Sequence, residues 1–105
     1  MEEPNLAYIK KIAKGSVSFE KDILNIVNEE LEGEIESYYS YFEAGDLKKA
    51  KIYVHRIKHK MMILGLEKSY EITNNYENDL RESNFTHQKY FESMLPIMIN
   101  YLKTL

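Results

Sequence analysis

Hydrophobic residues recur every three or four positions along almost the whole chain, which is the period of an amphipathic helix. The clearest case begins at Leu47, where apolar residues follow one another at intervals of 3, 4, 3, 4 and 3. These residues are Leu47, Ala50, Val54, Ile57, Met61 and Leu64. Gly45 and Asp46 precede them as a helix stop and an N-cap, and Gly65 follows as the next stop. The pattern predicts a helix from about Asp46 to Gly65 with one buried stripe.

The first half of the chain predicts two more helices. A short helix is expected over residues 5–13, and Gly15 ends it. Ser16 or Ser18 can cap a long second helix that runs to about Ala44. The apolar stripe of this second helix consists of Phe19, Ile23, Val27, Leu31, Ile35, Tyr38 and Phe42.

The second half predicts a fourth helix over about residues 67–81 and a last helix after a turn at residues 83–84, with Thr86 as its cap. Pro96 falls inside the last helix, so we expect a kink there or a break near Leu95. The stripe of the fourth helix is weaker and more polar, and consists of Tyr70, Thr73, Tyr76 or Glu77, and Leu80. The last helix is expected to bury Phe91, Met94 or Leu95, Met98, Tyr101 and Leu105.

Four long amphipathic helices with short connections, and no strand-like alternation, predict an all-α fold. We expect an antiparallel up-and-down four-helix bundle with a short extra N-terminal helix. The chain has 105 residues, 44% of them hydrophobic and 30% charged, which predicts a single domain over residues 1–105. It has no cysteine, which excludes disulfides and cysteine chemistry. Because no apolar segment suits a signal peptide or a membrane span, and each helix has one apolar stripe, we expect a cytoplasmic monomer.

Charge is distributed unevenly along the chain. The formal net charge is −3, yet residues 47–66 contain no acidic residue and six of the fourteen lysines and arginines. His55 and His59 lie in the same window. A positive segment in an acidic protein indicates an anionic partner, and a solvated helix face is the simpler alternative.

Residues 54–65, VHRIKHKMMILG, concentrate the candidate chemistry. His55 lies one residue past the buried stripe and therefore points about 100° away from it. Lys51, Lys58, His59 and Met62 share its face, because they lie three, four or seven residues from it. We therefore expect His55 to be partly exposed, surrounded by cations and next to an exposed methionine.

Three kinds of site fit this stretch less well. Histidines at positions i and i+4 have the spacing of a helical zinc pair, but the neighbouring lysines repel a cation, and we expect no metal. No Gly-x-Ser-x-Gly sequence supports a serine triad. The chain is acidic overall and its cations spread around the helix, so neither nucleic acid nor a membrane is an expected partner.

A phosphoryl acceptor fits better. A neutral imidazole is a good nucleophile near neutral pH, and cationic neighbours disfavour its protonation. The same cations can hold the oxygens of a transferred phosphoryl group.

The stretch is similar to the signature of the histidine-containing phosphotransfer (HPt) domain. That signature has a small residue, His, any residue, Leu, Lys and Gly, with a further Gly ten residues after the His. His55, Ile57, Lys58 and Gly65 match it. The upstream segments GSVSFEKDIL and EAGDLKKAKIYVH resemble other parts of the same domain, and the resemblance covers about residues 6–103.

The resemblance implies a phosphocarrier rather than an enzyme with its own substrate. Such a domain takes a phosphoryl group from an aspartyl phosphate of one response-regulator receiver domain, passes it to another, and works with a hybrid histidine kinase. His55 would be phosphorylated, on Nε2, and Lys58 would stabilise the phosphoryl oxygens. The chain would need no cofactor of its own, because the receiver supplies Mg²⁺.

One residue departs from the signature. The residue four after the histidine, usually glycine, is His59 here. It could shape partner choice, hydrogen-bond the phosphoryl group or impair transfer, and we expect it to contact the partner together with Met62 and Lys51. The alternative is a docking module that uses the same bundle surface without phosphorylation.

Overall fold

The computed structural model describes all 105 residues and contains helices and no strand. The helices are α1 (Ala7–Ala13), α2 (Val17–Glu43), α3 (Leu47–Ile63), α4 (Glu67–Asp79) and α5 (Gln88–Lys103), and the 3₁₀ turn η1 (Leu80–Glu82) extends α4. The predicted all-α bundle with a short N-terminal helix is confirmed.

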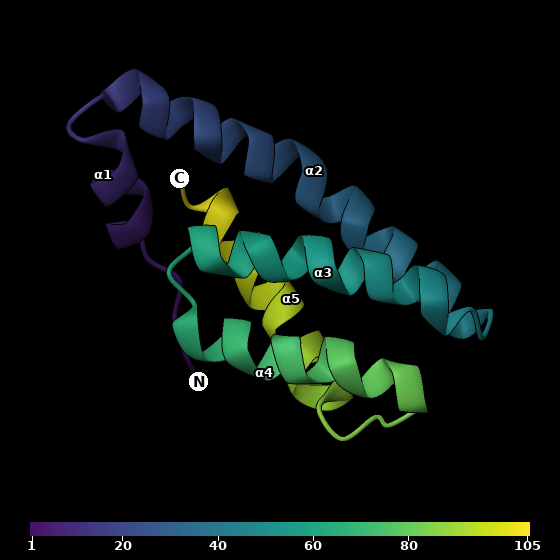
Figure 1. Cartoon of the computed structure of the whole chain (residues 1–105). Helices are drawn as coiled ribbons and strands as arrows, with labels where there is room; N and C mark the ends of the chain where they lie inside the picture. Colours follow the sequence, from purple (N-terminus) through teal and green to yellow (C-terminus); the bar gives the residue numbers. More distant parts are fainter.

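The four long helices pack in chain order, as Figure 1 shows. α2 and α3 lie side by side in opposite directions, α4 packs on α3, and α5 packs on both α4 and α2 and so closes the bundle. The short α1 folds back between the start of α2 and the end of α3. The molecule measures 43 × 23 × 19 Å. No helix combines the length and the apolarity that a membrane span requires.

Two of the predicted helix caps form and one does not. The side chains of Ser16 and Asp46 each accept a hydrogen bond from the backbone N–H three residues later, at 3.2 and 3.1 Å. The predicted cap at Thr86 is wrong, because α5 begins at Gln88 and Thr86 instead donates to Asn84 Oδ1 at 2.6 Å. The asparagine and threonine therefore build the turn before α5 rather than the helix itself.

The ends of the predicted stripes also differ from the structure. α5 runs past Pro96 without interruption, so of the two expected outcomes, a kink at Pro96 or a break near Leu95, the break does not occur. Pro96 lies on the exposed side of α5, where a carbonyl that loses its helical partner can bond to water. Phe19 and Leu105 are exposed rather than buried, because each lies at the end of its helix, beyond the packed part of the bundle.

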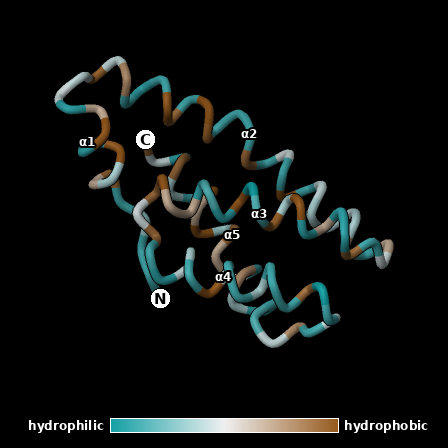
Figure 2. The backbone as a smooth tube through the Cα atoms, in the orientation of Figure 1, coloured by the Kyte–Doolittle hydropathy of each residue, from teal (hydrophilic) through white to brown (hydrophobic).

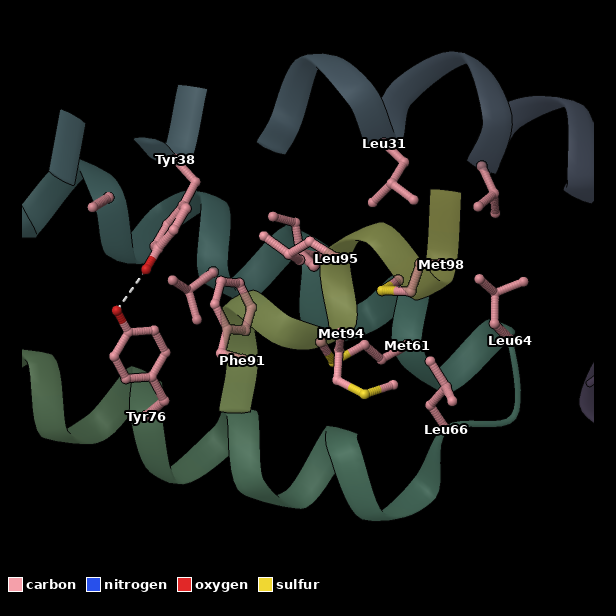
Figure 3. Close-up of a cluster of buried hydrophobic side chains, with 14 of the residues drawn as sticks. Leu31, Tyr38, Met61, Leu64, Leu66, Tyr76, Phe91, Met94, Leu95 and Met98 are labelled. Carbon is pink, nitrogen blue, oxygen red and sulfur yellow. Dashed lines mark hydrogen bonds between the residues drawn. The ribbon is translucent and has the colours of Figure 1, made fainter. Parts of the chain in front are cut away.

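The core fills the space between the four long helices (Figure 3). Apolar positions recur along α2, α3 and α5, whereas α4 is mostly hydrophilic (Figure 2). At one end of the core the buried hydroxyl of Tyr76 lies 2.6 Å from that of Tyr38, which donates in turn to Glu92 Oε2 at 2.8 Å. Burial raises the pKa of Tyr76 to about 12 and also raises the pKa of Tyr38, so both hydroxyls remain protonated at neutral pH. Tyr76 rather than Glu77 therefore faces the core.

A buried ion pair joins α2 to α3. Lys60 Nζ lies 2.9 Å from the carboxylate oxygens of Glu34 and 3.2 Å from Glu30 Oε1. Lys60 and Glu34 are both buried. Because the charges of a buried pair must meet to offset their desolvation, this contact fixes how α2 and α3 align along their length.

The N-terminal segment caps α4. Leu66, at the N-cap position of α4, has no side-chain acceptor, and the carboxylate of Glu2 takes that place. It accepts hydrogen bonds from the backbone N–H groups of Lys68 and Ser69 and from Ser69 Oγ, at 2.7–2.9 Å. Burial alone would raise the pKa of Glu2, but these hydrogen bonds outweigh it and lower the pKa.

Gly65 lies where the N-terminal segment crosses the end of α3. Its φ of +74° is a left-handed conformation, which glycine adopts without strain. The Asn5 side chain packs directly on it, so that an added Cβ would lie 2.5 Å from Asn5 Oδ1. The backbone N–H of Asn5 donates to the carbonyl of Leu64 at 2.8 Å. Gly65 is thus required both for the turn after α3 and for the path of the N-terminal segment.

Candidate functional site

His55 lies on the exposed face of α3, as predicted. Its side chain is 50% exposed, because it follows the buried Val54 and so turns away from the core. Its Nδ1 lies 2.9 Å from Glu77 Oε1 on the neighbouring helix α4. The ring is therefore held at Nδ1, while half of its surface remains exposed.

Glu77 fixes which nitrogen of His55 carries the proton. An ionised carboxylate only accepts hydrogen bonds, so Nδ1 must be the donor and Nε2 keeps its lone pair in the neutral ring. This acidic partner was not predicted from the sequence. The sequence did contain an indication of it. The apolar pattern of α4 left Tyr76 and Glu77 as alternatives for one core position, and with Tyr76 in the core, Glu77 lies beside it at the edge of the helix interface.

Lys58 does not lie at the surface beside His55. It is only 5% exposed, and its Nζ donates to Asn74 Oδ1 at 3.0 Å and lies 3.2 Å from Glu77 Oε1. Its ammonium also lies 5.4 Å from the centroid of the Tyr70 ring. The expected ring of exposed cations is wrong at this residue, because α4 covers Lys58 and supplies the carboxylate that compensates its charge. One oxygen of Glu77 thus meets both His55 and Lys58.

His59 covers the other nitrogen of His55. The two Nε2 atoms lie 3.0 Å apart, with the ring centroids separated by 4.6 Å and the planes inclined at 76°. Because Nε2 of His55 is unprotonated, Nε2 of His59 must be the donor. Burial and the nearby His55 and Lys58 lower the pKa of His59, so it is neutral at neutral pH.

Met62 lies in an open hollow of about 720 Å³ between α1 and the α3–α4 turn. It is exposed, as predicted, and Tyr8 and Lys11 of α1 line the same hollow with Tyr70. The N-terminal segment that packs on Gly65 therefore also brings α1 to this surface.

A second hollow, of about 400 Å³, adjoins His55 itself and is basic. Lys48, Lys51 and Arg56 line it together with Ile52, and Glu77 is the one acidic residue among its lining residues. None of these three cations lies within ion-pair distance of an acidic side chain. Lys51 is thus a free cation near His55, as predicted, and Lys58 is not.

The remaining histidine is separate from this cluster. His87 sits at the N-cap position of α5, 3.9 Å from Asp79 Oδ2, and contributes nothing to the surface around His55.

A half-exposed imidazole with a fixed tautomer can attack an electrophile through its free nitrogen. Here that nitrogen is Nε2 of His55, with the Glu77 carboxylate placed to offset the positive charge that the ring acquires. No protein-family model matches the chain, and comparison with curated proteins and with solved structures finds no match. The case for a function therefore comes from the geometry around His55.

Proposed function

We propose that this chain is a cytoplasmic histidine phosphotransfer protein of a phosphorelay, with His55 as the phosphoacceptor. It takes a phosphoryl group from the aspartyl phosphate of one response-regulator receiver domain and passes it to another, downstream of a hybrid histidine kinase. The observation that carries this proposal is the 2.9 Å hydrogen bond from His55 Nδ1 to Glu77, which leaves Nε2 nucleophilic on a half-exposed ring.

The transfer step follows from these contacts. The lone pair of His55 Nε2 attacks phosphorus in line, the N–P bond forms, and the P–O bond to the aspartyl carboxylate breaks. The departing carboxylate keeps the electron pair of that bond. The ring acquires positive charge, and the Glu77 carboxylate at Nδ1 offsets it. Lys58 acts through Glu77, because it holds the same oxygen that meets His55.

The surroundings of His55 suit an acidic partner that carries its own Mg²⁺. The free cations of the basic hollow, Lys51 among them, attract an acidic surface. Met62 offers an adaptable apolar contact on the other side. His59 must turn away from Nε2 before attack, and its N–H can then donate to a phosphoryl oxygen.

The test is phosphorylation by phosphoramidate and by a phosphorylated receiver domain, followed by intact mass measurement at neutral pH. We expect an adduct of one phosphoryl group that is lost in acid and absent in His55→Gln. Glu77→Gln removes a charged hydrogen bond of about 1.5–3 kcal/mol, so transfer is expected to slow by about 10–100-fold. Glu82→Gln, an exposed change in η1 at the end of the same helix, is the matched control and keeps the full rate.

One observation favours a second function, a docking module that is not phosphorylated. His59 occupies the approach to Nε2, 3.0 Å away. If the folded protein acquires no adduct from several donors but His59→Gly does, then His59 blocks the chemistry and the docking function holds. If neither protein is phosphorylated, His55 is not a phosphoacceptor.

A further inference from the structure

Two imidazole nitrogens on one helix meet at a distance that a metal ion can span. Nε2 of His55 and Nε2 of His59 lie 3.0 Å apart, four residues apart on α3. A transition metal binds imidazole nitrogen at about 2.0–2.1 Å, so two such nitrogens bound at right angles lie about 2.8–3.0 Å from each other. The two rings therefore need almost no movement to share a metal ion in place of a proton.

The orientation of the rings agrees with this distance. A five-membered ring with bonds of about 1.33 Å has each atom about 1.1 Å from its centroid. A straight N–H···N bond would then separate the centroids by about 5.2 Å, whereas two rings bound at right angles to one metal would separate them by about 4.4–4.6 Å. The observed separation is 4.6 Å.

The groups behind His55 also suit a metal ligand. A metal-bound histidine usually donates its other N–H to a carboxylate, which orients the ring and raises its basicity, and Glu77 does this at Nδ1. Glu77 and Asn74 also engage the ammonium of Lys58, the cation that would otherwise repel a metal most directly.

We propose that His55 and His59 form a binding site for a divalent transition-metal ion, and that the bound ion prevents phosphorylation of His55. No cluster of three or more metal-ligating side chains exists, so water fills the remaining positions and the site is open. The right-angle geometry favours nickel or copper, which accept square or octahedral coordination, over tetrahedral zinc. Binding follows from the geometry alone, whereas the block of phosphorylation rests on the proposed function. The block arises because one lone pair of His55 cannot bind both a metal and phosphorus.

Binding is tested by calorimetric titration of the full chain with nickel chloride at neutral pH. We expect one ion per chain in the wild type and in the control His87→Gln, and at least roughly tenfold weaker binding in His55→Gln and in His59→Gln. Glu77→Gln is expected to bind about 10–100-fold more weakly, and Mg²⁺, which prefers oxygen ligands, should not bind there. Equal affinity in the wild type and both histidine variants would overturn the site.

A measurement on the unaltered protein makes the test independent of the variants. Paramagnetic nickel should broaden the imidazole proton resonances of His55 and His59 before those of His87. If the signals of His87 broaden first, or all three broaden together, the site is wrong.

The block is tested by phosphoramidate labelling with saturating nickel. We expect labelling of the wild type to fall at least roughly tenfold and to recover on chelation, while labelling of His59→Gln falls less at the same nickel concentration, in proportion to its weaker binding. Tight nickel binding with unchanged labelling would overturn the proposed inhibition of phosphorylation, while the metal-binding site itself would stand. Absence of labelling without metal would overturn the proposed function, while the titration would still decide the metal site.

Discussion

Replacing Gly65 with alanine should destabilise the fold for two separate reasons. The left-handed backbone at φ +74° costs a residue with a Cβ about 1–2 kcal/mol. The new Cβ would also lie 2.5 Å from Asn5 Oδ1, so that carboxamide must turn away and lose its 3.0 Å hydrogen bond from the Ala7 N–H. Loss of this hydrogen bond before α1 costs about 1 kcal/mol. The total of about 2–3 kcal/mol corresponds to a melting temperature lower by about 10–15 °C, measured by far-UV circular dichroism.

Two other glycines and one asparagine separate these contributions. Gly45→Ala, at φ +77° in open space, should show the backbone cost alone. Gly33→Ala, inside α2 with nothing near its Cβ, should stabilise by about 0.5–1 kcal/mol. In an Asn5→Ala background, Gly65→Ala should cost about 1 kcal/mol less than in the wild type. The packing contribution would be refuted if Gly65→Ala lost no more stability than Gly45→Ala and if its loss were the same in the wild type and in the Asn5→Ala background.

Three further predictions concern side-chain polar contacts, each measured by urea unfolding. Tyr38→Phe leaves the buried hydroxyl of Tyr76 without its acceptor and should lower the free energy of unfolding by about 1–3 kcal/mol. If the double variant with Tyr76→Phe loses as much stability as the two single variants together, the hydrogen bond between them is contradicted. Lys60→Met should lower the free energy of unfolding by about 3–5 kcal/mol, because Glu34 is left buried without its partner charge. Adding Glu34→Leu should recover most of this stability, and no recovery would mean that the two residues are not coupled. Glu2→Gln should cost about 1 kcal/mol at neutral pH. Because folding lowers the pKa of Glu2 below its ordinary 4.5, its contribution is present above that pH and is lost as the pH falls through the folded pKa, so the deficit should shrink in acid rather than grow.

The helices could be predicted from the sequence because the features that indicate them, caps and apolar spacing, lie within each helix. The cap at Asp46 and the 3–4 spacing that follows it involve only residues within one helix, and both are present in the structure. The errors lie where the outcome depends on a neighbour. Phe19 has the right spacing to be buried but lies in the first turn of α2 and is exposed, and Pro96 is tolerated because its side of α5 faces solvent.

At the candidate site, too, some features could be predicted from the sequence and others depend on neighbouring helices. The exposure of His55 follows from its angle to the stripe of α3, so it could be predicted. The burial of Lys58 could not, because it depends on how α4 packs over α3, and on a carboxylate 19 residues further along the chain at Glu77. The contact between His55 and His59 depends on the rotamers of both rings, for which helical spacing is necessary but not sufficient.

The elongated shape has a hydrodynamic consequence. With extents of 43 × 23 × 19 Å, and a 27-residue α2 of about 40 Å lying along the long dimension, the molecule must tumble anisotropically. Amide N–H vectors in α2 point along that axis, so their transverse relaxation should be faster than that of vectors in the turns. A gel-filtration column should likewise overestimate the mass of a single chain. A monomer and a dimer are therefore better distinguished by light scattering or sedimentation equilibrium than by elution volume.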